Sequence, residues 1–97
     1  MVTVEFSIYP IGNSHISEDL NRVTAILKRS GLEYQIGPMS TSLVGEWDEV
    51  FSTIKSCHEE VAKDQERIIC NINVDDKRTA SSEHLRSRVE KMERKAS

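Results

Sequence analysis

The sequence lacks the features that define several common protein classes. Its 97 residues include only two cysteines, two prolines and four glycines, and aromatic residues make up 5% of the chain. Two cysteines are too few for a disulfide framework, so Cys57 and Cys70 are expected to be reduced and mostly buried thiols. No apolar run approaches the roughly 18–20 residues that span a bilayer, and no secretory signal is visible. We therefore expect a cytosolic protein without membrane contacts.

What is present is typical of one ordinary globular domain covering residues 1–97. Hydrophobic residues make up 37% and charged residues 30% of the chain, and the net charge of −3 argues against a nucleic-acid-binding surface. Residues 1–76 carry six Lys and Arg against thirteen Asp and Glu, whereas residues 77–97 carry seven against three. An acidic body and a basic tail would attract a second copy of the chain, but a basic helix in water explains the tail almost as well.

Hydrophobic periodicity predicts four strands and three helices. The strands, marked by alternating apolar and polar residues, are expected at 2–9, 32–36, 41–46 and 67–74. Helices are expected after Ser17 and after Asp48, which we interpret as N-caps, and over about 81–95. Trp47 is expected to pack against Phe51 where the second helix begins.

This order of elements predicts an α+β fold of the ferredoxin-like type, an antiparallel βαββαβ sheet with two helices on one face plus a C-terminal helix. The helix-facing side of the sheet is expected to take two apolar rows. These rows are Val2, Val4, Phe6 and Ile8 in the first strand and Ile68, Cys70, Ile72 and Val74 in the last. The C-terminal helix has a narrow apolar seam, so we expect it at a subunit interface rather than in the main core.

Signals for catalysis and for metal binding are weak. Cys57 and His58 are adjacent on a helix and point about 100° apart, so they do not form a nucleophile–base pair. The three histidines lack metal-ligand spacing, and no phosphate-binding or dinucleotide-binding glycine motif occurs. Tyr9 is the only aromatic residue at the positions where an RNA-binding version of the fold would stack bases. We therefore expect no enzyme, no catalytic residues and no metal.

Polar side chains gather on the predicted sheet face that lies away from the helices. They are Glu5, Ser7, Tyr9, Asn71 and Asn73, with Glu46 at the edge of the third strand. Carboxylates beside amides and hydroxyls suit a cationic small molecule that also forms hydrogen bonds. A solvated or subunit-facing surface explains the same pattern at least as well.

Four segments, in order along the chain, resemble the small thiamine-binding protein family. They are 9–12 (YPIG), 34–41 (YQIGPMST), 45–50 (GEWDEV) and 73–78 (NVDDKR). The resemblance implies a ferredoxin-like subunit that assembles into dimers and then tetramers and binds thiamine or a pyrimidine precursor without chemistry. The family pattern Met-Gly-Thr is replaced here by Met39-Ser40-Thr41, so a loop that requires glycine's positive φ would have to differ.

The resemblance also implies roles for individual residues. Glu5 or Glu46 would balance the positive thiazolium ring, and Ser7, Thr41, Asn71 or Asn73 would bond the aminopyrimidine. Tyr9, Tyr34 or Trp47 would stack on a ring, although packing explains Tyr34 and Trp47 better. The leading hypothesis is a homodimer or homotetramer that binds a small cationic heteroaromatic ligand and needs no other cofactor. The alternative is a regulatory or protein-interaction module whose polar sheet face is only a subunit interface.

Overall fold

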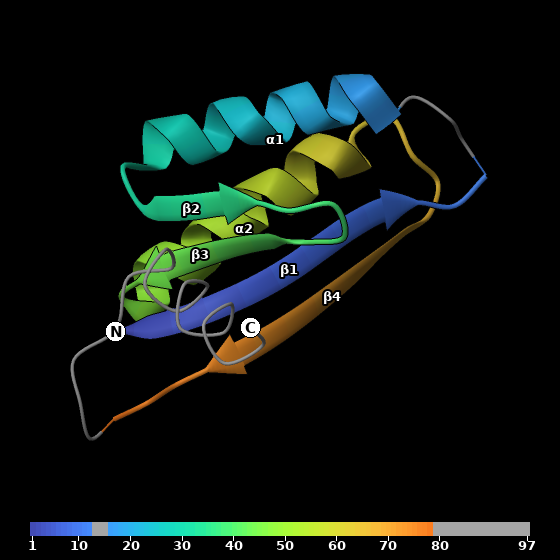
Figure 1. Ribbon diagram of the computed structural model, residues 1–97. Helices are drawn as coiled ribbons and strands as arrows, with labels where there is room; N and C mark the ends of the chain where they lie inside the picture. The colour runs from blue at the N-terminus through green and yellow to red at the C-terminus, as the bar shows by residue number, and fades with distance from the viewer. Residues whose placement is uncertain (13–15, 79–97) are drawn as a thin grey trace, which may run out of the picture.

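The computed structural model describes residues 1–12 and 16–78. Its elements follow one another as β1 (Val2–Pro10), α1 (Ile16–Ser30), β2 (Glu33–Ile36), β3 (Thr41–Gly45), α2 (Trp47–Ala62) and β4 (Ile68–Asp75). The strands form one antiparallel sheet in the order β2-β3-β1-β4, and both helices lie on the same face of it (Figure 1). The structure thus confirms the ferredoxin-like α+β fold. The predicted helix at about 81–95 lies outside the described residues.

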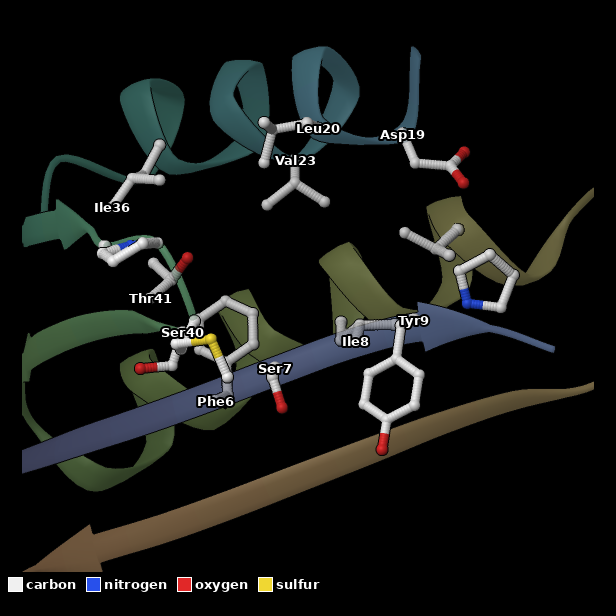
Figure 2. Close-up of a pocket in the computed structure, with 15 residues that line it drawn as sticks. Phe6, Ser7, Ile8, Tyr9, Asp19, Leu20, Val23, Ile36, Ser40 and Thr41 are labelled. Carbon is white, nitrogen blue, oxygen red and sulfur yellow. The ribbon is translucent and has the colours of Figure 1, made fainter. Parts of the chain in front are cut away.

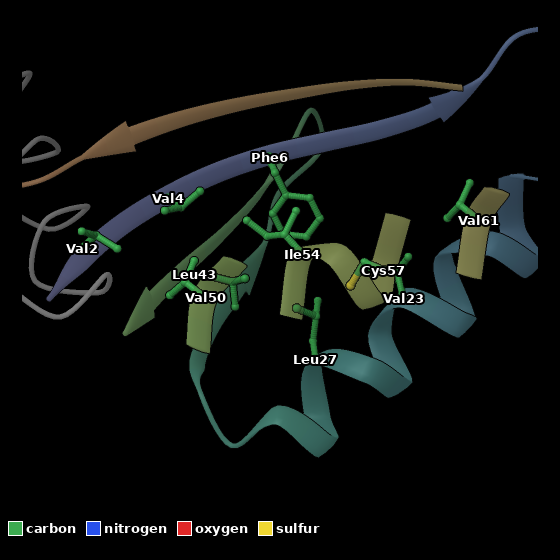
Figure 3. Close-up of a cluster of buried hydrophobic side chains, with 10 residues drawn as sticks. All are labelled: Val2, Val4, Phe6, Val23, Leu27, Leu43, Val50, Ile54, Cys57 and Val61. Atoms are coloured by element: carbon green, nitrogen blue, oxygen red, sulfur yellow. The ribbon is translucent and has the colours of Figure 1, made fainter. Parts of the chain in front are cut away.

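The hydrophobic core fills the space between the two helices and the centre of the sheet (Figure 3). Its fully buried members come from β1, α1, β3 and α2. They are Val4, Leu27, Leu43, Val50, Cys57 and Val61. Because apolar residues alternate along β1 and recur every three or four positions in the helices, each element turns one apolar side to this core.

Strand β1 is longer than its neighbour β3, nine residues against five. Strand β3 pairs with Val2–Phe6, and its first residue, Thr41, lies opposite Phe6. Strand β4 pairs with β1 as far as Pro10. Within residues 1–12 and 16–78, residues 7–10 of β1 therefore have a partner strand on one side only. We call these four residues, with the β2–β3 turn at 37–40, the stepped end of the sheet.

Both helices begin earlier than predicted. α1 begins at Ile16, so Ser17 lies inside the helix rather than at its N-cap. α2 begins at Trp47, and its N-cap is Glu46, whose carbonyl oxygen accepts the Val50 N–H at 2.9 Å. Asp48 instead lies in the first turn of α2, where the helix dipole stabilises its negative charge. The predicted contact of Trp47 with Phe51 is confirmed, with ring centroids 4.6 Å apart.

The apolar row of β4 contributes less to the core than predicted. Ile72 and Val74 lie directly opposite Phe6 and Val4, which places them on the helix-facing side of the sheet as expected. They are nevertheless 40% and 41% exposed. The reason is that β4 is the edge strand, and the two helices lie mainly over the other strands (Figure 1).

Candidate functional site

The stepped end contains a pocket of about 180 Å³ between α1, β1 and the β2–β3 turn. Leu20 and Val23 reach down from α1, while Phe6 and Ile8 face them from β1 (Figure 2). The turn from Gly37 to Thr41 closes the third side. A cavity of roughly 150 Å³ holds one benzene molecule, so this pocket has room for one aromatic ring.

The pocket exists because β3 ends before β1 does. The Ile11 N–H donates to the Arg67 carbonyl oxygen at 3.0 Å, on the β4 side of β1. Backbone groups alternate in direction along a strand, so those of Ile8 point to the opposite side, beyond the end of β3. Within the described part of the chain, no strand residue pairs with Ile8 there. Its N–H and C=O therefore border the pocket as a donor and an acceptor.

The β2–β3 turn keeps an ordinary backbone despite Ser40. The Gly37 N–H donates to the Ser40 carbonyl oxygen at 2.8 Å, which closes the turn. Positive φ angles among the described residues occur only at Gly12 and Gly31. Ser40 therefore needs no glycine-like conformation, and its Cβ causes no backbone strain in this turn.

Asp19 is a buried carboxylate in the wall of the pocket, and its residue is 6% exposed. Its Oδ1 accepts a hydrogen bond from Arg22 Nη2 at 2.6 Å. Arg22 Nη1 donates to Asp64 Oδ2 at 3.1 Å, which ties α1 to the residues after α2. The hydrogen bond to Asp64, followed by the charges of the surrounding carboxylates, raises the pKa of Arg22. Arg22 thus stays a cation shared between two carboxylates.

The predicted polar residues of β1 and β4 do lie together on the sheet face away from the helices, which we call the polar face. Glu5 is opposite Asn73, and Ser7 is opposite Asn71. Asn73 Nδ2 donates to Glu5 Oε1 at 3.3 Å, and Asn71 Nδ2 donates to Tyr9 Oη at 3.5 Å. These bonds are long and exposed, so the side chains can exchange them for bonds to a ligand at little cost.

The other two predicted residues lie elsewhere. Thr41 is opposite Phe6 on the helix-facing side, where it is 8% exposed and lines the pocket. Glu46 follows Gly45, whose partner is Val2, at the far end of β1 from Tyr9. At about 3.3 Å per residue, the two ends are separated by roughly 23 Å. The structure therefore does not bring Glu46 to the pocket or to the polar residues near Tyr9.

Asp19 is the pocket residue that the sequence interpretation missed. An acidic residue in the first turn of a helix is ordinarily explained by the helix dipole, which favours a carboxylate there. The spacing held a second signal, since Asp19 precedes Val23 by four positions and Leu27 by eight, in the same buried stripe. An acidic residue in the apolar stripe of a helix is a candidate for a function.

Other kinds of site find little support in the described part of the chain. No cluster of three His, Cys, Asp or Glu residues there could hold a metal ion. Burial raises the pKa of the Cys57 thiol to about 11 and also raises the pKa of Cys70, which disfavours the reactive thiolate. No helix among residues 1–12 and 16–78 is long and apolar enough to cross a membrane.

These features define a ferredoxin-like α+β domain with a ring-sized pocket at one end of its sheet. The chain belongs to the thiamine-binding protein family, whose sequence profile matches residues 4–93. It is 30% identical to a UPF0045 protein of Methanothermobacter thermautotrophicus, over 98% of this chain and 99% of that one. It is also 30% identical to the UPF0045 protein YqgV of Bacillus subtilis, over 93% and 92% of the two chains.

Solved structures share the fold at lower identity. A hypothetical protein of Methanocaldococcus jannascii superimposes with a TM-score of 0.83 at 22% identity, over 95% of each chain. A Thermotoga maritima protein, named for thiamine biosynthesis or salvage, superimposes with a TM-score of 0.77 at 22% identity. That match covers 94% of this chain and 97% of the other.

Proposed function

We propose that this protein binds thiamine or a related pyrimidine or thiazole precursor, without catalysing a reaction on it, and does so as a homo-oligomer. The observation that carries the proposal is the ring-sized pocket at the stepped end, which combines apolar walls with hydrogen-bonding groups. Membership of the thiamine-binding family supports the choice of ligand.

Thiamine has two linked rings, an aminopyrimidine and a positively charged thiazolium. At about 180 Å³ the pocket is smaller than the roughly 300–1,000 Å³ of sites that enclose a whole drug-sized ligand. We assign the pyrimidine ring to the pocket, where the Thr41 hydroxyl and the Ile8 backbone supply donors and acceptors. The thiazolium ring then lies outside, towards Tyr9 and the exposed carboxylate of Glu5 on the polar face.

A site that holds half of its ligand would be completed by a second copy of the chain. Two features of β4 support self-association. It is an edge strand, and Ile72 and Val74 expose apolar side chains on it. Exposed edges and apolar patches favour contacts with another chain. The same features would favour a protein-interaction module, which is the second candidate function.

Native mass spectrometry with added thiamine tests ligand and assembly together. We expect an oligomer that gains the mass of one thiamine per site and returns it unchanged. A monomer, or an oligomer that gains no mass with thiamine, its phosphates or its pyrimidine precursor, would contradict the corresponding half of the proposal. Release of a chemically altered ligand would contradict the non-catalytic assignment.

Glu5→Gln tests the place of the thiazolium ring. Loss of an exposed counter-charge is expected to weaken thiamine binding about two- to fivefold by calorimetry, because exposed ion pairs contribute about 0–1 kcal/mol. Glu46→Gln is the matched control, since Glu46 lies at the other end of the sheet, and it should leave the affinity unchanged. Equal affinities of Glu5→Gln and wild type would remove Glu5 from the site.

A further inference from the structure

The buried carboxylate of Asp19 has one oxygen that nothing in the described part of the chain satisfies. Oδ1 is held by Arg22, whereas Oδ2 is buried and has no hydrogen-bond partner among the residues that the structure describes. Buried polar atoms in native proteins are almost always paired with protein, water or ligand. An ionised carboxylate is an acceptor only, so the missing partner of Oδ2 is a donor.

The position of Asp19 points to a ligand as that donor. Among the described residues that line the pocket, Asp19 carries the one charged side chain. It lies on α1 beside Leu20 and Val23, which reach down towards β1 from the same helix (Figure 2). The terminal torsion of an aspartate is broad, and the partly exposed Arg22 side chain can follow a small rotation about Cβ–Cγ that turns Oδ2 towards a ring in the pocket.

The surrounding charges favour a cationic or amino-bearing donor. Arg22 binds Oδ1 of Asp19 and Oδ2 of Asp64 at once, so this group of three keeps a net negative charge. Arg22 does not line the pocket, whereas Asp19 does. A ligand with a positive or strongly donating N–H would therefore be attracted, whereas a carbonyl at the same position would be repelled.

We propose that Asp19 is a specificity-determining residue, whose Oδ2 accepts a hydrogen bond from the amino group or protonated ring nitrogen of a planar heteroaromatic ring in this pocket. The choice of thiamine as the ligand rests on the proposed function above. The ligand class does not, because it follows from the ring-sized cavity, its apolar walls and the unpaired acceptor.

The experiment uses two pairs of ligands on the full-length protein. The first pair is thiamine and its analogue with an oxo group in place of the pyrimidine amino group. The second pair is 4-aminopyridine and 4-methylpyridine, at a pH where the former is a cation and the latter is neutral. Calorimetry measures affinity, and amide chemical shifts of Leu20 and Val23 locate the binding. We expect wild type to prefer the amino member of each pair by about tenfold or more, typical of a hydrogen bond to a charged group.

Asp19→Asn then removes the charge while keeping the shape and the acceptor for Arg22. We expect the preference for the amino ligand to fall close to unity, because the new Nδ2 group donates rather than accepts. Asp64→Asn is the matched control. Asp64→Asn removes the charge of the other partner of Arg22, which lies outside the pocket, and it should keep the wild-type preference. If Asp19→Asn does not fold, a wild-type ratio near one within each pair still overturns the inference.

The outcomes separate this inference from the proposed function. Thiamine binding with no amino preference, or with a preference that Asp19→Asn retains, overturns the role of Asp19 and leaves the thiamine proposal standing. Aminopyridine binding that depends on Asp19, without thiamine binding, supports the inference and refutes thiamine. If wild type binds neither amino ligand, both are refuted.

Discussion

The two ends of β1 have different surroundings although one continuous strand forms both. Thr3–Phe6 lies between two partner strands, and Val4 and Phe6 are at most 3% exposed. Residues 7–10 have β4 on one side and the pocket on the other. The apolar alternation is the same at both ends, so the difference arises from where β3 stops. The pocket therefore arises because β3 is shorter than β1, and not because the side-chain pattern changes along β1.

Packing around Gly45, at the end of β1 that pairs with β3, is tight. A Cβ atom at Gly45 would lie 3.0 Å from Leu32 Cδ2 and 3.2 Å from Val50 Cγ2. At the stepped end the same fold leaves about 180 Å³ free. We call the region around Gly45, Val50 and Leu43 the packed end. The packed end should determine stability, and the stepped end should determine binding.

The largest expected effect comes from one substitution made at both ends. Leu43→Ala removes a fully buried side chain at the packed end and should lower the free energy of unfolding by about 2–5 kcal/mol. Leu20→Ala removes a side chain that is 49% exposed at the pocket, and should cost less than about 1 kcal/mol. Urea denaturation at one fixed protein concentration measures both. Equal losses would show that the stepped end is packed in solution.

Much of this contrast could be predicted from the sequence. Alternation in β1 correctly placed Glu5, Ser7 and Tyr9 on one face, because the side-chain period of a strand leaves no other choice. The helical spacing of apolar residues likewise points to Leu27 and Val50 as core residues, and both are fully buried. These are local rules, and each residue needs only its own element to obey them.

The parts that escaped prediction depend on neighbours. The exposure of Ile72 depends on β4 being an edge strand that the helices do not cover, which its own alternation does not reveal. The placement of Thr41 in the pocket depends on β3 beginning at that residue, opposite Phe6. Asp19 was detectable in the helical stripe, but its unpaired oxygen is a property of the folded packing.

Replacing one valine at each end by phenylalanine compares the two ends again, with smaller expected losses of stability. Val50→Phe at the packed end should destabilise the protein by about 1–3 kcal/mol, because the added ring meets close-packed atoms. Val23→Phe can place part of its ring in the pocket, so it should destabilise the protein less than Val50→Phe does, by under about 1 kcal/mol. Its thiamine affinity should nevertheless fall more than tenfold by calorimetry. Unchanged affinity would move the ligand out of this pocket.

The smallest effect concerns the two cysteines. Cys57 is fully buried in the core, whereas Cys70 lies opposite Ile8 at the stepped end and is half-buried. Desolvation, the larger cause, and the nearby Cys70 raise the pKa of Cys57 to about 11. Folding therefore favours the protonated thiol. The stability that this contributes is complete below the thiol's ordinary pKa and is lost as pH rises from about 9 to about 11.

Alkaline unfolding of Cys57→Ala, Cys70→Ala and wild type tests this assignment. Wild type should lose stability across that pH range, and Cys57→Ala should lose less, because it has no buried thiol to ionise. Cys70→Ala should stay closer to wild type, since the Cys70 thiol is less buried. Alkylation in the native state should likewise reach Cys70 before Cys57. If Cys57 reacted first, the core around α2 would have to open more readily than the stepped end. Such a result would contradict the assignment of stability to the packed end and of binding to the stepped end.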